Sequence, residues 1–213
     1  MSKPLRIAVE GNIGVGKSTL LPRLQAAMPG KWEVLSERVD EDPTFQRLLA
    51  EFYADPNKQI ELQSWITQRR LVEFRKLENN PTHYIFERSF LGELVFCHAN
   101  LLQHERPDGR FISFFFDVIA ALKECRYDAI VYLQADPDTC YERVKYRARG
   151  AENSISYEYI RHLHDCYETH LPEAARVHGI PLVTVDWDQF GAAEGVAEQL
   201  QLSLDYYNIK MAG

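Results

Sequence analysis

The sequence lacks a C-x-x-C pair of cysteines and lacks any long apolar run, and both absences narrow the classes of protein to which it can belong. None of the 4 cysteines forms a C-x-x-C pair, so we expect buried free thiols in a reducing compartment. No apolar run approaches the roughly 20 residues of a membrane-spanning helix. The first residues lack the charged start and apolar core of a signal peptide. We therefore expect a cytoplasmic protein without membrane contact, or a mitochondrial one only if a transit peptide has been removed.

Basic residues are also scarce relative to acidic ones. The chain carries 24 Lys and Arg against 31 Asp and Glu, for a net charge of −7. An acidic chain disfavours a broad nucleic-acid-binding face, although local basic clusters can still bind small anions. We find no internal repeat and no low-complexity segment. The length of 213 residues suits a single α/β domain spanning residues 1–213.

The most informative segment is a glycine-rich stretch near the start of the chain. It matches the G-x-x-x-x-G-K-[ST] pattern, follows an apolar run and precedes a helical one, as a phosphate-binding P-loop does. Glycines let backbone N–H groups curl around an anion, and the following helix N-terminus adds positive potential. We expect Lys17 to contact the β- and γ-phosphates of a nucleoside triphosphate and the Ser18 hydroxyl to coordinate Mg²⁺. The stretch consists of Gly11, Asn12, Ile13, Gly14, Val15, Gly16, Lys17, Ser18 and Thr19.

Short apolar segments alternate with longer amphipathic ones along the chain. This alternation predicts an α/β fold with a parallel five-stranded sheet flanked by helices. The expected strands are Leu5–Glu10, Trp32–Leu35, His83–Phe86, Ala129–Gln134 and Pro181–Val185. The expected helices are Thr19–Met28, Thr44–Ala54, Ile60–Glu78, Leu91–Gln103, Phe111–Cys125, Asp138–Arg147, Ser156–His178 and Gly195–Leu204. Residues 104–110 predict a loop, and the polar segment 147–156 predicts a mobile flap.

Two acidic groups follow predicted strands, where a phosphoryl-transfer site would need them. Glu37 follows the second strand and would face the P-loop at the carboxyl edge of the sheet, where it could accept the proton of an attacking hydroxyl. Glu87 and Arg88 follow the third strand and could serve Mg²⁺ and phosphate respectively. The plainer alternatives are a surface glutamate and a local ion pair. A guanine-binding N-K-x-D motif is absent, which disfavours a GTPase.

A third group is basic. Arg143 and Arg147 share one face of a predicted helix, and Arg149 and Glu152 follow them in the predicted flap. Arginines in that place could close over a transferring phosphoryl group and neutralise its developing charge. A solvated basic face is the alternative interpretation.

Together these motifs resemble those of the deoxyribonucleoside kinase family, over a stretch from Leu5 to about Phe190. The resemblance rests on the order and spacing of the motifs. They are E-G-N-I-G-V-G-K-S-T at 10–19, Glu37, F-E-R-S at 86–89, I-V-Y-L-Q-A-D-P-D-T-C at 130–140, Arg147-Ala148-Arg149, and Y-E-Y-I-R-H-L-H at 157–164. The resemblance implies a P-loop kinase fold with an arginine-bearing LID at about 143–156. It also implies phosphorylation of the 5′-hydroxyl of a deoxyribonucleoside, with ATP as phosphate donor and Mg²⁺ as cofactor.

The resemblance implies roles for individual residues as well. Glu37 would be the general base, Arg88 would hold the hydroxyl or the incoming phosphate, and Glu87 would help place Mg²⁺ or be the base itself. In the acceptor, the sugar 3′-hydroxyl would be bound by Tyr53 and Glu152, and the base by Gln63, Arg70 and Glu93. In ATP, the adenine would be bound by Asp188, Gln189 and Phe190, and the phosphates by Arg143, Arg147 and Arg149. An acid–arginine pair of Arg70 with Glu93 favours deoxyadenosine, deoxycytidine or deoxyguanosine over thymidine.

Assembly and the exact acceptor stay open at this level. The apolar helices within residues 91–125 are equally typical of a core and of a dimer interface, and family likeness implies a homodimer through them. A nucleoside monophosphate kinase of the thymidylate kinase type would share the P-loop and flap, but it needs more cationic groups for its acceptor phosphate. A non-catalytic ATP-binding regulatory subunit is a further alternative, disfavoured because Glu37 and the E-R-S residues are present.

Overall fold

A computed structural model describes residues 3–37, 41–101, 109–147 and 155–212 of the chain. Two predicted site residues, Arg149 and Glu152, lie outside the described residues. So do most of the predicted loop at 104–110 and the centre of the predicted LID.

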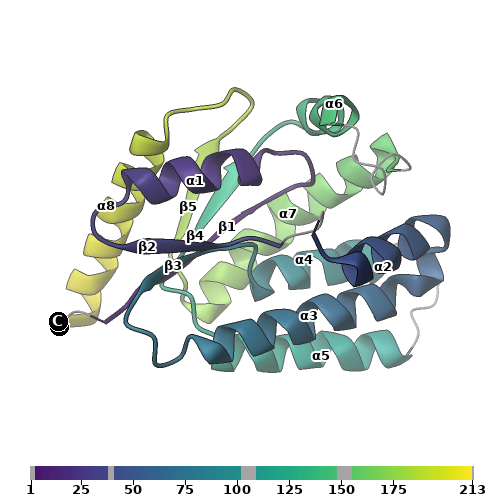
Figure 1. Ribbon diagram of the computed structural model, residues 1–213, viewed down its shortest axis with the longest axis horizontal. Helices are drawn as coiled ribbons and strands as arrows, with labels where there is room; N and C mark the ends of the chain where they lie inside the picture. Colours follow the sequence, from purple (N-terminus) through teal and green to yellow (C-terminus); the bar gives the residue numbers. More distant parts are fainter. Residues whose placement is uncertain (1–2, 38–40, 102–108, 148–154, 213) are drawn as a thin grey trace.

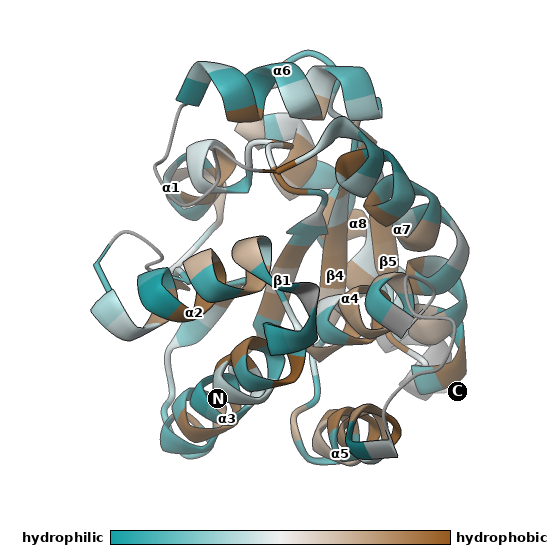
Figure 2. Ribbon diagram, turned by 90° about the vertical axis from the view of Figure 1, so that its right-hand side faces the viewer, coloured by the Kyte–Doolittle hydropathy of each residue, from teal (hydrophilic) through white to brown (hydrophobic). Residues whose placement is uncertain are grey.

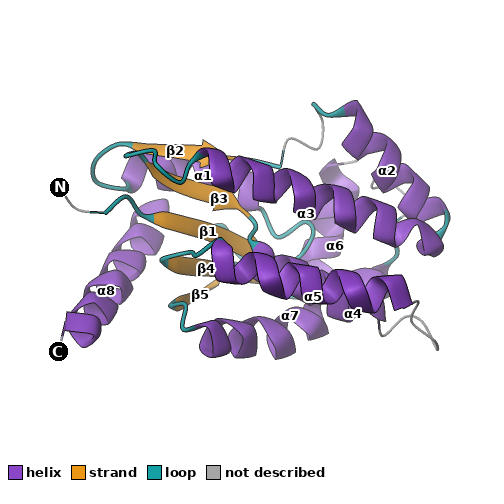
Figure 3. Ribbon diagram, turned by 90° about the horizontal axis from the view of Figure 1, so that it is seen from below, coloured by secondary structure: helices purple, strands orange, loops and turns teal. Residues whose placement is uncertain are grey.

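A parallel sheet of five strands lies at the centre of the molecule, in the order β2-β3-β1-β4-β5 (Figures 1 and 3). Each neighbouring pair of strands is parallel; Val9 on the central strand, for example, pairs with Glu87 on one side and with Val131 on the other. The strands are β1 (Arg6–Gly11), β2 (Trp32–Leu35), β3 (His83–Glu87), β4 (Ala129–Gln134) and β5 (Leu182–Asp186). All five predicted strands are confirmed, each to within one residue at either end.

Helices cover both faces of the sheet, because its strands are apolar on both sides. One face packs against α1 (Lys17–Ala27) and α8 (Ala193–Ala212). The other packs against α3 (Gln59–Lys76), α4 (Phe90–Leu101), α5 (Gly109–Glu124) and α7 (Tyr157–His178). Near the carboxyl edge of the sheet lie α2 (Pro43–Ala54), the short 3₁₀ turn η1 (Pro56–Lys58) and α6 (Pro137–Arg147).

Two helix boundaries differ from the prediction in a way that matters: the start of the first helix, beside the P-loop, and the end of the last helix. The first helix begins at Lys17 rather than Thr19, because Gly16 in the left-handed region closes the P-loop directly onto it. The last helix continues beyond the predicted Leu204 to Ala212, and Tyr206 and Tyr207 in this extension are exposed. An apolar pattern marks only that part of a helix which packs against a core.

Helix α5, in the apolar region 91–125 for which the sequence favours a core and an interface equally, carries both buried and exposed apolar side chains. On α5, Phe111 and Phe114 are buried against α4 and the sheet, whereas Phe116 is 63% exposed and Ile112 45% exposed. Figure 2 shows this helix at the edge of the molecule, with apolar residues in brown. All four cysteines are buried free thiols, as expected. Within the described parts of the chain, no helix combines the length and the apolar character needed to cross a membrane.

Candidate active site

The P-loop joins β1 to α1 in the geometry that its glycines allow. Gly14 and Gly16 have φ of 81° and 107°, in the left-handed region that other residues avoid. A Cβ on Gly14 would overlap the backbone carbonyl oxygen of Cys140, and a Cβ on Gly16 would lie 2.6 Å from the Phe190 ring. These two glycines therefore bring α6 and the loop after β5 against the P-loop, where only a bare backbone fits.

The side chains of Lys17 and Asn12 make different contacts in this loop. The Lys17 Nζ donates hydrogen bonds to the carbonyl oxygens of Gly11 at 3.1 Å and Asn12 at 2.9 Å. Burial, reinforced by the nearby charge of Arg88, lowers the pKa of Lys17 to about 7. The Asn12 amide instead reaches away from the loop and donates to the carbonyl oxygen of Ile160 on α7, at 2.9 Å. Asn12 was predicted as a ligand-binding residue, but its side chain braces the P-loop against α7.

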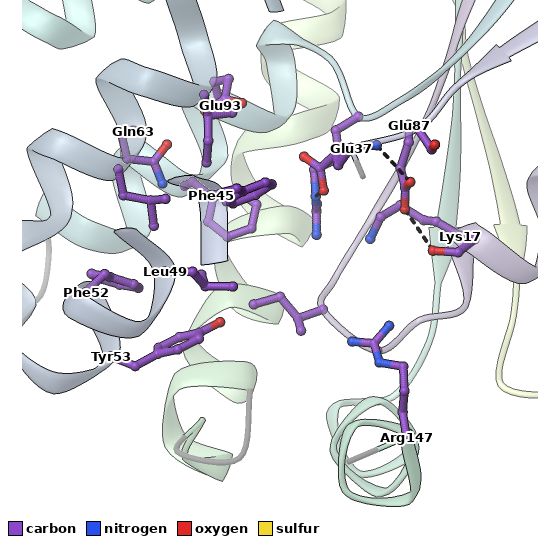
Figure 4. Close-up of a pocket in the computed structure, with 18 of the residues that line it drawn as sticks. Lys17, Glu37, Phe45, Leu49, Phe52, Tyr53, Gln63, Glu87, Glu93 and Arg147 are labelled. Atoms are coloured by element: carbon purple, nitrogen blue, oxygen red, sulfur yellow. Dashed lines mark hydrogen bonds and ion pairs between the residues drawn. The ribbon is translucent and has the colours of Figure 1, made fainter. Parts of the chain in front are cut away.

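The two candidate bases lie next to each other at the ends of β2 and β3, as their positions in the sequence predicted (Figure 4). One carboxylate oxygen of Glu87 accepts a hydrogen bond from the Ser18 hydroxyl at 3.0 Å. The other accepts one from the backbone N–H of Glu37 at 3.2 Å. Glu87 thus connects the P-loop to the end of β2 and holds Glu37 beside it.

The Glu37 carboxylate lies between two buried arginines. One oxygen accepts from Arg70 Nη2 at 3.2 Å, and the other accepts from Arg88 Nε at 3.3 Å. Burial alone would raise the pKa of Glu37, but the charges of Arg88, Arg70 and, more weakly, Lys17 outweigh it and lower that pKa below the ordinary value. Glu37 is therefore an ionised carboxylate at neutral pH, and its side chain is 17% exposed toward the cavity. Such a group can accept a hydrogen bond or a proton from a hydroxyl.

The acid–arginine pair predicted at the base edge forms as expected. Arg70 Nη2 contacts a carboxylate oxygen of Glu93 on α4 at 2.9 Å, and both side chains are buried. Burial raises the pKa of Glu93 above its ordinary value, against the opposing effect of Arg70. Gln63 also faces this region from α3, and its buried Oε1 has no hydrogen-bond partner within the described chain. An unpartnered buried acceptor beside a buried ion pair suits a ligand that brings its own donor.

One cavity of about 270 Å³ lies between the P-loop, α2 and α3, and its polar lining includes Lys17, Ser18, Glu37, Gln63, Glu87, Arg88 and Glu93, but not Arg70. Tyr53 also lines it, and its ring points toward the interior in Figure 4. The apolar wall was not predicted from the sequence, and it includes Phe45, Leu49, Phe52, Leu62 and Ile66. The first three are spaced as on one helix face, a pattern that could have pointed to α2 but is equally typical of an ordinary core helix.

The two predicted phosphate-binding arginines of α6, Arg143 and Arg147, have different surroundings. Arg147 lines the cavity and extends toward it from α6 (Figure 4). Arg143 instead donates to three backbone carbonyl oxygens, those of Val15 at 2.9 Å, Trp187 at 3.1 Å and Asp188 at 2.7 Å. Its guanidinium also lies over the Phe190 ring, 4.2 Å from the ring centre. In this structure Arg143 joins the P-loop to the loop after β5.

That loop carries the three residues predicted to hold the adenine of ATP. Phe190 is 51% exposed beside Gly16, and Gln189 is also exposed. Asp188 is partly buried, and its Oδ1 accepts a hydrogen bond from the backbone N–H of Asp136 at 2.7 Å. The aromatic ring thus borders the P-loop, while Asp188 fixes the loop to the end of β4.

The site also contains oxygen ligands of the kind that Mg²⁺ prefers. The Ser18 hydroxyl and the Glu87 carboxylate are 3.0 Å apart, next to the amide-rich P-loop. No cluster of three or more histidine, cysteine, aspartate or glutamate side chains suited to a resident metal is found among the described residues. The donor set therefore fits a magnesium ion shared with bound phosphates better than an all-protein metal cage.

Comparisons with known proteins agree with this geometry. The sequence model described as "Deoxynucleoside kinase" matches residues 7–204. A probable deoxycytidine kinase of Fowlpox virus is 30% identical, covering 79% of this chain and 72% of the relative. Deoxyadenosine kinase of Dictyostelium discoideum is 25% identical, covering 92% of this chain and 77% of the relative. The solved structure of deoxyadenosine kinase from M. mycoides with bound dATP superimposes with a TM-score of 0.75 at 24% identity, covering 94% and 100% of the two chains. The chain belongs to the deoxynucleoside kinase family and is an enzyme that phosphorylates deoxyribonucleosides.

Proposed function

We propose that this kinase transfers the γ-phosphoryl group of ATP to the 5′-hydroxyl of a deoxyribonucleoside, with Glu37 as the general base. The observation that carries the proposal is the position of the Glu37 carboxylate, which lies between Arg70 and Arg88 at the wall of the cavity next to the P-loop. The depressed pKa of Glu37 keeps it ionised, so it accepts the hydrogen bond of the sugar hydroxyl and then its proton.

In this proposal one end of the cavity binds the triphosphate and the other binds the deoxyribonucleoside. At the P-loop, Lys17 and the backbone amides bind the triphosphate, while Arg88 and Arg147 offset the charge that develops on the transferred group. Ser18 and Glu87 would hold Mg²⁺, which would neutralise phosphate charge when bound. At the other end Tyr53 faces the sugar, and Glu152 is proposed as its partner at the 3′-hydroxyl. Catalysis is then mostly positioning and electrostatic stabilisation.

The adenine of ATP is proposed to lie against Phe190, beside Asp188 and Gln189. Phe190 offers a half-exposed aromatic face next to Gly16. In this arrangement Arg143 and Arg149 act from the LID, Arg143 through its contacts with the P-loop and with Trp187 and Asp188.

For the base, we propose a preference for deoxyadenosine, deoxycytidine or deoxyguanosine over thymidine. Glu93, paired with Arg70, and the unpartnered Oε1 of Gln63 line the cavity and present acceptors to a base edge. An exocyclic amino group would satisfy the acceptor on Gln63. Relatives named for deoxyadenosine and deoxyguanosine support this preference, although human mitochondrial thymidine kinase 2 is 30% identical over 76% of this chain.

We further propose a homodimer through α4 and α5, in a cytoplasmic protein. Phe116 and Ile112 expose apolar surface on α5, at the edge of the molecule (Figures 1 and 2). Charged residues are depleted and aromatic residues enriched at the centre of such interfaces.

A panel of acceptors tests the proposed reaction. With labelled ATP and Mg²⁺, the four deoxynucleosides and their 5′-monophosphates are offered separately, and kcat/KM is measured for each. We expect turnover of nucleosides, greatest for one of the three that carry an exocyclic amino group, and none of monophosphates. Preferred turnover of a monophosphate would replace the proposal with a nucleoside monophosphate kinase, which would need to bind one more phosphate in this cavity. ATP binding without any transfer would indicate a regulatory role instead.

A further inference from the structure

We propose that Tyr167, anchored by Glu10, is a positioning residue that holds Arg88 against Glu37. Neither Tyr167 nor Glu10 lines the cavity, and both are fully buried behind it. The proposal rests on the proposed role of Glu37 as the base and deepens it, because it assigns the groups that orient the arginine beside the base.

Arg88 has a backbone conformation that needs support. Its φ is 68°, and it is the non-glycine residue with a positive φ in the described chain. For a residue with a Cβ, the left-handed region costs about 1 kcal/mol or more. Its amide nevertheless donates to the Val9 carbonyl oxygen at 3.0 Å, so the strained residue is fixed to β1 at the point where β3 ends.

Glu10 supplies part of that support from the central strand. Its carboxylate accepts hydrogen bonds from the backbone N–H and the hydroxyl of Ser89, the latter at 2.7 Å. The Ser89 hydroxyl in turn accepts from the backbone N–H of Leu91 at 3.1 Å, at the start of α4. A Cβ on Gly92 would overlap both carboxylate oxygens of Glu10, so α4 approaches this carboxylate as closely as glycine permits. Glu10 therefore fixes the turn that contains Arg88.

Tyr167 reaches the same turn from α7. Its hydroxyl accepts a hydrogen bond from Arg88 Nη1 at 2.6 Å and donates one to Glu10 Oε2 at 3.1 Å. Arg88 Nη1 also donates to the Gly11 carbonyl oxygen at 2.9 Å. With Nη1 held by these two oxygens, the guanidinium presents its Nε edge to Glu37 at 3.3 Å. Loss of the Tyr167 hydroxyl would remove one of these two hydrogen bonds of Nη1, while the ion pair of Nη1 with Glu10 at 3.8 Å and the Phe96 ring, with its centre 4.8 Å from the guanidinium carbon, would remain.

The consequence concerns the geometry of the pair formed by Arg88 and Glu37. Arg88 Nε contacts the Glu37 carboxylate at 3.3 Å, so a guanidinium released from its fixed orientation would no longer hold that carboxylate in place. Misplacement of a catalytic group lowers kcat, whereas substrate affinity that other residues supply is kept. A residue that only supports the fold would change stability without lowering kcat in this selective way.

Tyr167→Phe tests the proposal, since it removes the hydroxyl and keeps the ring. We expect kcat/KM for the nucleoside to fall roughly tenfold, as the loss of one hydrogen bond to a charged group gives. The KM for ATP should change little. The fall should appear in kcat, while the KM for the nucleoside stays close to the wild-type value.

Tyr132→Phe is the matched control. The Tyr132 ring is also buried and stacks on Tyr167 with ring centres 5.8 Å apart, but its hydroxyl donates to Glu168 and not to the Arg88 network. We expect this variant to keep the wild-type kcat.

Two outcomes distinguish this proposal from the proposed function. A kcat of Tyr167→Phe equal to that of Tyr132→Phe would overturn the positioning role and leave the kinase reaction intact. A crystal structure of Tyr167→Phe in which Arg88 Nε has moved away from Glu37, for a protein that phosphorylates no nucleoside even as wild type, would support the positioning of Arg88 and contradict the proposed reaction.

Discussion

The Glu87 carboxylate accepts a hydrogen bond from the backbone N–H of Glu37 at 3.2 Å, so the two candidate bases are parts of one unit. The second oxygen of Glu87 is held by the Ser18 hydroxyl of the P-loop. The Glu37 carboxylate accepts hydrogen bonds from the side chains of Arg70 and Arg88, and Glu37 lines the cavity. We infer a division of labour in which Glu87 serves the phosphate side and Glu37 serves the acceptor hydroxyl.

Arg70→Gln should destabilise the protein in a pH-dependent way. Arg70 contacts both Glu37 and Glu93, so its loss leaves two buried carboxylates without their shared counter-charge. We expect the free energy of unfolding to fall by about 3 kcal/mol at pH 8. Burial raises the pKa of Glu93 to about 7 even with Arg70 present.

The sign of the pH dependence follows from that raised pKa. Without Arg70 the pKa of Glu93 in the folded protein rises further above that of the unfolded chain, so the folded protein binds more protons at intermediate pH. Folding is then favoured by protonation, and the loss at pH 5 should be smaller than the loss at pH 8. Urea unfolding at both pH values measures it. Arg69→Gln removes half-exposed pairs with Asp42 and Glu73 and should cost under about 1 kcal/mol. Equal losses for the two variants would contradict the account.

ATP binding at pH 8 should take up a proton. Burial and the charge of Arg88 lower the pKa of Lys17 to about 7, so this amine is mostly neutral at pH 8 in the free enzyme. The triphosphate favours the ammonium form and raises that pKa again. Titration calorimetry in two buffers of different ionisation enthalpy measures the uptake. In Lys17→Arg, which is charged throughout, the proton uptake should vanish; the same uptake in this variant would assign it to another group.

Phe116→Asp should dissociate the proposed homodimer. Phe116 is 63% exposed on α5, and a carboxylate in its place would be desolvated in the interface on both subunits. Size-exclusion chromatography with light scattering should find a dimer for the wild type and a monomer for the variant. Leu202→Asp is the matched control, because Leu202 is 64% exposed on α8, away from this surface. A wild-type monomer, or dissociation by both changes alike, would contradict the proposed interface.

The sequence predicts the sheet and the convergence of these groups at its carboxyl edge, for a physical reason. Parallel strands have their carboxyl ends on one side, so residues at or after those ends must converge. Glu37 follows β2, Glu87 ends β3 and Arg88 follows it, and the P-loop lies at the end of β1, which pairs with β3. Local patterns in the chain therefore place these groups together without any knowledge of packing.

Other parts of the site depend on packing that no local pattern contains. Helical spacing puts Arg143 and Arg147 on one face, but it does not reveal that Arg143 is taken up by backbone carbonyl oxygens. The apolar face of α2 looks like any core helix until it is found to line a cavity. Tyr167 is 79 residues from Arg88 along the chain, and only the fold brings its hydroxyl to that guanidinium.

Replacement of the proposed base tests the central claim most directly. Glu37→Gln keeps the size of the side chain and its ability to accept one hydrogen bond, but it cannot take a proton at neutral pH. We expect kcat for nucleoside phosphorylation to fall roughly 10²–10⁴-fold while ATP still binds. Glu33→Gln, an exposed change on the same strand β2, should leave turnover unchanged. Turnover of Glu37→Gln close to that of the wild type would contradict the account.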